Sequence, residues 1–389
     1  MEKKEGDLDG QPGPVAQFMY RWMGYGVPVS KGSYSSREKT AALLEVTRPL
    51  LALMGPPVAG AGAVLAINGF PSLSKCFLGS LLVLVATFGM HTFNDWRDKK
   101  RDLRAWPGRP IPSGRLKPPE ALLLSLFFFA LSLIGAWILF NATLFVLLLL
   151  ALTLGVVYCL VLRDRVGYLS LPPIVGLFPV GGWAAFSPDT LFTNPLPWLL
   201  YLLTVGWQAG HIMVYSAGHP IEEVGGRKKT EVPALLFRPS PVAASLSGLV
   251  FLVATLVVSI GLYLASPLRY PYLVIAVGSA LIVVTAALRL LRDPLNRRKA
   301  LLAFNVASFY EMALFGGILV DVFVFRVASK YGRIGLSYLS ARPEFIPVVV
   351  ALGLSLIAIA LSGAVLVCLA ARLFHNFLRN DRFQEIATD

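Results

Sequence analysis

The feature that most constrains this chain is a series of long apolar runs. They recur along most of the 389 residues, of which 56% are hydrophobic and 15% are charged. Soluble globular chains average about 45–50% apolar and roughly 25% charged residues. Apolar runs of about 18 residues or more are typical of transmembrane helices. The sequence therefore predicts a polytopic, all-α integral membrane protein.

About ten apolar windows are long enough to form transmembrane helices. They lie near residues 41–66, 74–97, 119–139, 142–162, 168–187, 196–217, 241–265, 271–291, 299–325 and 345–375. The fifth window contains Pro172, Pro173 and Pro179 together with several glycines. Irregular backbone at membrane depth needs protein or water as a hydrogen-bond partner. We therefore expect a kinked or broken helix there that lines an internal chamber.

Basic residues gather at alternate connections between the windows and give the chain a net charge of +13. They follow the second, fourth, sixth and eighth windows and recur in the C-terminal tail. The positive-inside rule then places these connections and both termini in the cytoplasm. The connection at 326–344 does not fit, because its four basic residues fall on the opposite side. We interpret the positive charge as a sign of orientation and of attraction to anionic lipid or phosphate, not of nucleic-acid binding.

Four polar side chains follow the second window. Asn94, Asp98 and Asp102 are spaced i, i+4 and i+8, so they share one face if the helix continues through them, with Asp95 about a quarter-turn away. Two carboxylates and an amide form an oxygen set that suits Mg²⁺. The alternative is a solvated helix end in which each aspartate pairs with a basic residue of 97–101.

The segment Trp106–Arg115 comes next and is rich in proline and glycine. This composition predicts a rigid turn rather than a helix or strand. The turn would hold Arg109 and Arg115 close to the helix end that carries the carboxylates. A guanidinium group binds phosphate oxygens through its planar fork. Carboxylates beside fixed arginines predict a diphosphate-like ligand that binds together with a metal ion.

A second polar segment, residues 219–233, also joins an apolar window to carboxylates, glycines and a basic run. Glu222 and Glu223 are candidates for a second metal ion, and Lys228 lies in the basic run. The alternative is a solvated acidic turn.

Two polar residues near the end of the fourth window, Tyr158 and Arg163, are predicted on the same side of the membrane as both polar segments. Arg163 is either a third phosphate contact or an interfacial anchor, and the same choice applies to Arg48, which can also snorkel to the interface. We interpret His211, inside the sixth window, as a helix-packing residue. The cysteines lack metal-ligand spacing and are interpreted as packing residues too.

Together these residues resemble the UbiA superfamily of intramembrane prenyltransferases. The family motif N-D-x-x-D-x-x-x-D is matched in full by residues 94–102, and the R-P-(L/I)-P-S-G-R that follows it is matched by Arg109–Arg115. Thr47-Arg48-Pro49 and the pair of Tyr158 and Arg163 also look like family features. The resemblance covers about residues 40–325.

The resemblance implies nine transmembrane helices around a central chamber, with a tenth, C-terminal helix in addition. It divides the chain into an N-terminal polar or interfacial arm (1–40), a helical bundle (41–325), and an extra loop, helix and basic tail (326–389). It implies transfer of an isoprenyl group from an isoprenyl diphosphate to a hydrophobic acceptor, which is an aromatic compound, a quinone precursor or a lipid, with the help of Mg²⁺. The implied metal-binding and catalytic residues are Asn94, Asp95, Asp98, Asp102, Glu222 and Glu223. The implied diphosphate contacts are Arg109, Arg115, Arg163, Tyr158 and Lys228.

The second acidic motif departs from the family pattern. Its glycine, threonine and proline are retained, but its two aspartates align with Gly218 and Glu222 or with His219 and Glu223. Histidine is an unusual ligand for so hard an ion. The second metal site is therefore altered, and the alternative function is a catalytically degenerate membrane protein that binds isoprenoid lipid.

Two other classes fit less well. A secondary transporter agrees with ten helices and a broken fifth one, but its binding site lies near the membrane midplane rather than at one surface. The run from Trp207 to His211 faintly resembles the haem-farnesylating branch of the superfamily. The proline that precedes the histidine in that branch is missing, and we do not place the chain there.

Overall fold

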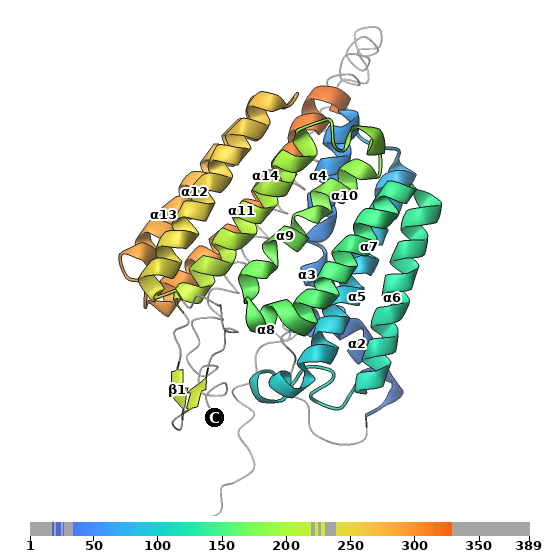
Figure 1. Ribbon diagram of the computed structural model, residues 1–389, viewed down its shortest axis with the longest axis vertical. Helices are drawn as coiled ribbons and strands as arrows, with labels where there is room; N and C mark the ends of the chain where they lie inside the picture. Colours follow the sequence, from blue (N-terminus) through green and yellow to red (C-terminus); the bar gives the residue numbers. More distant parts are fainter. Residues whose placement is uncertain are drawn as a thin grey trace, which may run out of the picture. The chain divides into compact units, whose positions relative to one another are not determined.

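Long helices dominate the part of the chain that the computed structural model describes (Figure 1). That part comprises residues 34–218 and 239–328, together with 18, 21–24, 26, 222–224 and 227–229. The predicted tenth helix at 345–375 lies outside it. Two compact units are present. The first contains Met1–Arg48 and Asp98–Lys117, and the second contains Pro49–Arg97 and Pro118–Ala328.

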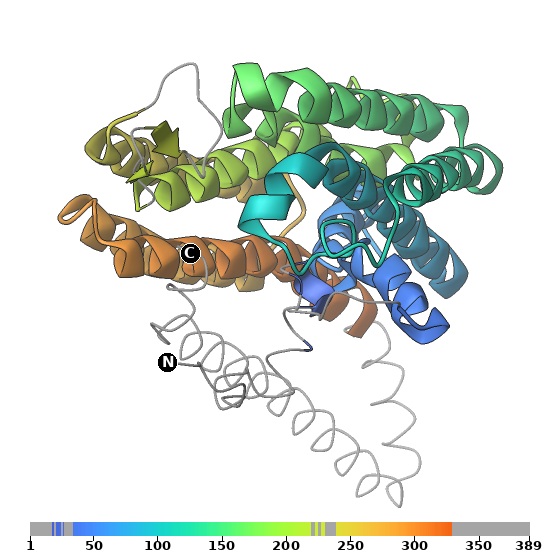
Figure 2. The same ribbon diagram turned by 90° about the horizontal axis from the view of Figure 1, so that it is seen from below.

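The second unit is a helical bundle. Its long helices are α4 (Gly55–Ile67), α6 (Pro118–Leu139), α7 (Ala142–Val157), α11 (Leu196–Ala217), α12 (Pro241–Ala265), α13 (Tyr270–Leu291), α14 (Arg297–Val322) and most of α5 (Leu73–Ala105). Its short elements are α3 (Pro49–Ala52), η1 (Tyr158–Leu162), α8 (Arg163–Arg165), η2 (Tyr168–Ser170), α9 (Pro172–Val175), α10 (Leu177–Ala184), η3 (Pro188–Thr190) and η4 (Phe323–Ala328). Helices α13 and α14 lie side by side in both views, as do α11 and α12 (Figures 1 and 2). Buried side chains such as Leu203, Leu252 and Phe315 form the core between them.

Six helices of the described residues are long and apolar enough to cross a membrane. The number is seven if the pair Ser36–Ala52 and Gly55–Ile67 counts as one bent span. Large apolar side chains such as Phe77, Leu123 and Leu264 remain exposed on these helices, as expected for a surface that faces lipid rather than water. The all-helical, multi-pass architecture is confirmed, and the count of nine spans stays a prediction.

The predicted break in the fifth window is confirmed. Proline residues start α9, and the helix is interrupted at Gly176 before α10 begins. Helix α10 crosses α4 in very close contact: a Cβ atom at Gly182 would lie 1.8 Å from the carbonyl oxygen of Ala59. A side chain does not fit there, so glycine is needed for the crossing. Helix α10 also lines a cavity of about 360 Å³, in agreement with the prediction that this segment borders an internal chamber.

The first unit is built from α2 (Ser36–Glu45), the last turns of α5 and the turn that follows α5. Ser35 and Glu38 form a capping box that starts α2. Residues 106–117 contain turns and bends without helix or strand, as their proline and glycine content predicts. Their backbone is closed by hydrogen bonds from the Ser113 amide to the Arg109 carbonyl and from the Leu116 amide to the Pro110 carbonyl, each 3.0 Å long.

Candidate functional site

The acidic residues of the first motif lie on one uninterrupted helix. Helix α5 continues to Ala105, so the condition on which the predicted one-face arrangement rested is met. Asn94 lies in the part of α5 that belongs to the second unit, while Asp98 and Asp102 lie in the part that belongs to the first. Helical spacing of four residues places the three oxygen-bearing side chains along one side of α5 over about 12 Å.

Two carboxylates of this helix are buried and each is paired with an arginine. Asp98 accepts a hydrogen bond from Arg101 Nη2 at 2.5 Å. Asp102 accepts one from Arg109 Nη1 at 2.8 Å. The prediction that the turn holds Arg109 beside the helix end is therefore confirmed. Burial would make two unpaired carboxylates costly, and the arginines compensate that cost.

Arg109 is fixed by more than this ion pair. Its Nε donates to the carbonyl oxygen of Gly24 at 2.7 Å, and its guanidinium carbon lies 5.1 Å from the centre of the Trp106 ring. Both contacts restrict the rotamers of a long side chain. A restricted guanidinium loses less conformational entropy when it binds a ligand.

Arg115 has a different environment. Its guanidinium makes an ion pair with Glu45 at 2.7 Å and donates hydrogen bonds to the Gly108 carbonyl at 2.9 Å and to Ser113 Oγ at 3.1 Å. Arg21 Nε also reaches Glu45 at 2.7 Å. These contacts tie the turn to α2, which makes Arg115 a positioning residue in this structure. Its direct contact with diphosphate stays a prediction.

Asn94 has its own arginine partner within the second unit. Arg163 Nη1 donates to Asn94 Oδ1 at 2.8 Å, and Arg163 Nη2 lies 3.5 Å from the Cys159 carbonyl. Arg163 follows a π-helical turn, η1, which also contains Tyr158. Such turns are frequent at functional sites. Tyr158 is buried and packs with Phe93. The structure therefore brings Arg163 and Asn94 together across α5 and α8.

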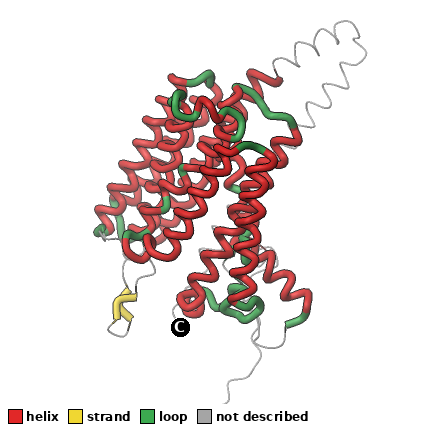
Figure 3. Tube along the Cα trace, turned by 45° about the vertical axis from the view of Figure 1, so that its right-hand side comes forward, coloured by secondary structure: helices red, strands yellow, loops and turns green. Residues whose placement is uncertain are grey.

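The second acidic segment is a short hairpin rather than a simple turn. Strands β1 (Glu222–Val224) and β2 (Arg227–Lys229) pair antiparallel, with Glu223 opposite Lys228 (Figure 3). His219 lies outside the described residues. Within the described residues, no three histidine, cysteine, aspartate or glutamate side chains come together as a metal site. The roles of Glu222, Glu223, Lys228 and the buried Asp95 stay predictions.

Three partners of the site are missing from the sequence-based set: Gly24, Tyr34 and Glu45. Gly24 orients Arg109, and Tyr34 donates a hydrogen bond to the Ser113 carbonyl at 2.7 Å. Glu45 is a carboxylate at the start of an apolar window, and such residues are generally functional or paired. This anomaly was the available signal for Glu45, whereas nothing in the local pattern marked the other two.

The family of the chain follows from comparison with known proteins. Residues 54–309 match the model of the UbiA prenyltransferase family. Protoheme IX farnesyltransferase of Desulforudis audaxviator (strain MP104C) is 31% identical over 297 residues, which are 74% of this chain and 90% of that protein. A solved structure of Digeranylgeranylglyceryl phosphate synthase has 18% identity and a TM-score of 0.60, and covers 74% of this chain and all of its own.

A UbiA homolog from Archaeoglobus fulgidus, solved with GPP and Mg²⁺ bound, has 19% identity and a TM-score of 0.50 and covers 71% of this chain and 99% of its own. The two solved structures support a common fold. The match of the family model to well over half of the chain and the identity to the farnesyltransferase agree with the fold and with the paired acidic and basic residues of α5. The chain belongs to the UbiA prenyltransferase family of multi-pass membrane enzymes.

Proposed function

We propose that this enzyme binds an isoprenyl diphosphate at the C-terminal half of α5 and transfers its isoprenyl group to a hydrophobic acceptor. The observation that supports this assignment best is the buried pair of Asp102 and Arg109. One side chain is suited to a metal ion, the other to phosphate oxygens, and both are fixed at the same end of one helix. Transfer from an isoprenyl diphosphate needs both of these functions at one place.

The residues present fit a bound Mg²⁺. Magnesium typically takes one or two carboxylates and completes its shell with water and phosphate oxygens. Asp98 and Asp102 supply two carboxylates, and Asn94 adds an amide oxygen on the same side of α5. When bound, Mg²⁺ neutralises charge on the departing diphosphate. We assign Asp98 and Asp102 as metal ligands and Asn94 as a further oxygen ligand.

The arginines act on the diphosphate itself. Arg109 is held beside Asp102, so a diphosphate bridged to that carboxylate lies within reach of the guanidinium. Arg163 is held beside Asn94 in the same manner. Fixed positive groups stabilise charge as it develops on a leaving group without having to reorganise. Arg115 contributes by holding the turn that carries Arg109.

The acceptor reaches this site from the membrane, which favours an aromatic compound, a quinone precursor or a lipid. The positive charges at the same end of the bundle place this surface in the cytoplasm. Residues 41–325 would form the catalytic bundle, with 1–40 and 326–389 as additions to it.

The test is product formation by the purified protein in lipid nanodiscs. Farnesyl and geranylgeranyl diphosphates are incubated with Mg²⁺ and a membrane lipid extract, and released diphosphate and prenylated products are measured by mass spectrometry. We expect Asp98→Asn and Asp102→Asn each to reduce turnover by about a hundredfold or more. Asp293→Asn is the matched control, because Asp293 pairs with Lys299 in an exposed connection outside the site. Unchanged turnover in Asp98→Asn, or lipid binding without any product, would contradict the proposal and favour a degenerate isoprenoid-binding protein.

A further inference from the structure

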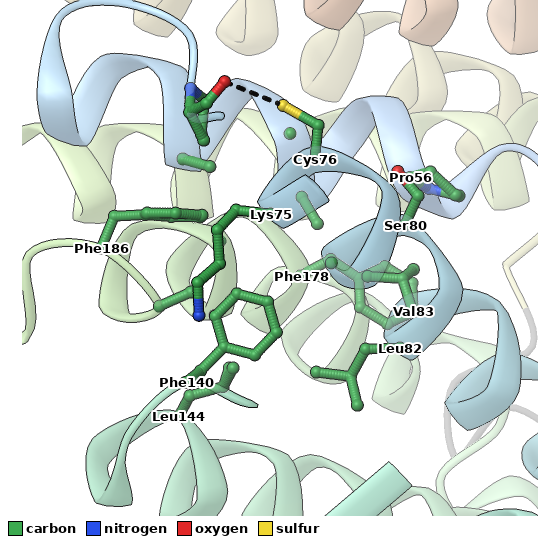
Figure 4. A pocket seen from close by; sticks show the side chains of 18 of the residues that line it. Pro56, Lys75, Cys76, Ser80, Leu82, Val83, Phe140, Leu144, Phe178 and Phe186 are labelled. Atoms are coloured by element: carbon green, nitrogen blue, oxygen red, sulfur yellow. Dashed lines mark hydrogen bonds between the residues drawn. The ribbon is translucent and has the colours of Figure 1, made fainter. Parts of the chain in front are cut away.

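The second unit contains an apolar cavity of about 360 Å³ that the proposed reaction has not yet used. Residues of α4, α5, α7, α10 and α14 line it. Its wall is almost entirely hydrocarbon, with Phe140, Phe178 and Phe186 among its aromatic members (Figure 4). A cavity of this size and composition is within the range of small-molecule pockets in proteins.

One polar group, Lys75, lies at the rim of the cavity and is already engaged. Its ammonium lies 4.9 Å from the centre of the Phe140 ring and donates a hydrogen bond to the Leu139 carbonyl. Figure 4 shows Lys75 beside the Phe140 ring, with Leu144 close by. With its ammonium held by the ring and the carbonyl, the lysine leaves the interior without a free charge. The cavity is therefore suited to a hydrocarbon chain and not to a polar acceptor.

Helix α5 connects this cavity to the diphosphate site. Asn94, Val83 and Cys76 are spaced by eleven and seven residues, so they lie within about 20° of one line along the helix. Val83 and Cys76 line the cavity, as does Ala86. From Asn94 to Ala86 is eight residues, about 12 Å at 1.5 Å per residue, and Gly79, also in the cavity wall, lies about 22 Å from Asn94.

We propose that the cavity receives the distal isoprene units of the donor and thereby selects long prenyl chains. This inference rests on the proposed function, since it takes the diphosphate to lie at Asn94 and beyond. With carbon–carbon bonds of about 1.5 Å, an extended isoprene unit adds about 5 Å. A geranyl chain, about 10 Å long, ends before Ala86, whereas a farnesyl chain passes it. A geranylgeranyl chain, about 20 Å long, reaches the neighbourhood of Gly79.

Two glycines in the cavity wall offer places where the chain can be shortened. A Cβ atom at Gly79 would lie 3.6 Å from Phe140 Cζ, and one at Gly181 would lie 3.5 Å from Leu144 Cδ1. Both are ordinary van der Waals distances, so leucine at either position fills the cavity without displacing backbone. Gly278 on α13 is the matched control, because no atom lies within 4 Å of its Cβ position and it does not line the cavity.

The experiment compares geranyl, farnesyl and geranylgeranyl diphosphates as donors for the wild type and for Gly79→Leu, Gly181→Leu and Gly278→Leu. In Gly79→Leu we expect kcat/KM for geranylgeranyl diphosphate to fall by about tenfold or more, since misfits in an apolar pocket have effects of this size. The loss for farnesyl diphosphate is smaller and that for geranyl diphosphate is less than about twofold. Equal losses for all three donors, or no loss with the longest, would overturn the proposal.

A binding measurement keeps this inference separate from the proposed function. Thermal stabilisation by the geranyl and geranylgeranyl thiodiphosphates, which resist transfer, is measured for the same variants. If the wild type makes no product from any donor, the proposed function fails, but the cavity is still tested by binding. Selective loss of stabilisation by the geranylgeranyl compound in Gly79→Leu supports the cavity assignment, and equal stabilisation in all variants refutes it.

Discussion

The buried ion pair between Glu45 and Arg115 is predicted to hold the Trp106–Arg115 turn in place. Each side chain is 1% exposed, while Arg21, the other partner of Glu45, is 37% exposed. The contribution of Arg21 is therefore small, because exposed pairs are worth little. The change that isolates the buried pair is Glu45→Gln, which keeps the shape and removes the charge.

The expected size of the effect follows from the burial. Removing one partner of a buried pair costs about 3–5 kcal/mol, because the remaining charge is left without compensation. The glutamine oxygen still accepts a hydrogen bond from Arg115, so we take the lower end, about 3 kcal/mol. This corresponds to about a hundredfold increase in the population of the opened turn. The donor KM should rise as well, because Arg109 lies in the same turn.

Hydrogen exchange followed by mass spectrometry on the peptide 106–117 in nanodiscs measures this opening. The Ser113 and Leu116 amides close the turn, so their protection should fall by about a hundredfold. Glu38→Gln is the control, because Glu38 is exposed on the same helix and caps only its first turn. A second test combines Glu45→Gln with Arg115→Gln, which should cost less than the sum of the single changes. Protection within about twofold of the wild type in Glu45→Gln would refute the reasoning.

Three further substitutions test other contacts. At Gly26, φ is +79° and a Cβ atom would lie 2.4 Å from the Gly108 carbonyl carbon, so Gly26→Ala should move the N-terminal arm away from the turn and lower kcat/KM by about tenfold, with increased proteolysis near residue 26 as the readout. Gly182→Ala should destabilise the bundle by about 3 kcal/mol, visible as a lower thermal midpoint, whereas Gly278→Ala should be neutral or slightly stabilising; equal midpoints would contradict this. Arg163→Lys loses its planar contact with Asn94 and should raise the donor KM by about tenfold with little change in kcat; an unchanged KM would leave Arg163 as an anchor.

The transmembrane helices could be predicted well from the sequence, because the thickness of a bilayer fixes the length of an apolar run. The windows at 119–139, 241–265 and 271–291 agree with α6, α12 and α13 to within one residue at either end. The end of α5 is different, since the 74–97 window closes eight residues before the helix does. Hydropathy falls where charged residues begin, but backbone hydrogen bonding continues through them.

The one-face spacing of the acidic residues and the nearness of Arg109 to Asp102 were also predictable, because both depend on residues close together in the chain. The partners that orient these groups were not. Glu45 lies 70 positions before Arg115, and Gly24 lies 85 positions before Arg109. Local spacing carries no information on such pairs. The N-terminal arm reads as a polar tail until tertiary structure brings it to the turn.

The pairing of every acidic ligand with an arginine has a consequence for how metal and diphosphate bind. Asp98 and Asp102 are neutralised by Arg101 and Arg109 in the absence of ligand, so Mg²⁺ alone must displace these cations. A diphosphate offers the arginines new anionic partners, so we expect each ligand to increase the affinity for the other by about tenfold, a typical coupling. Calorimetric titration of Mg²⁺ with and without a donor thiodiphosphate measures the coupling. Arg109→Gln should raise the affinity for Mg²⁺ alone and weaken the coupling. Independent binding of the two ligands in the wild type would show that the arginines do not exchange partners.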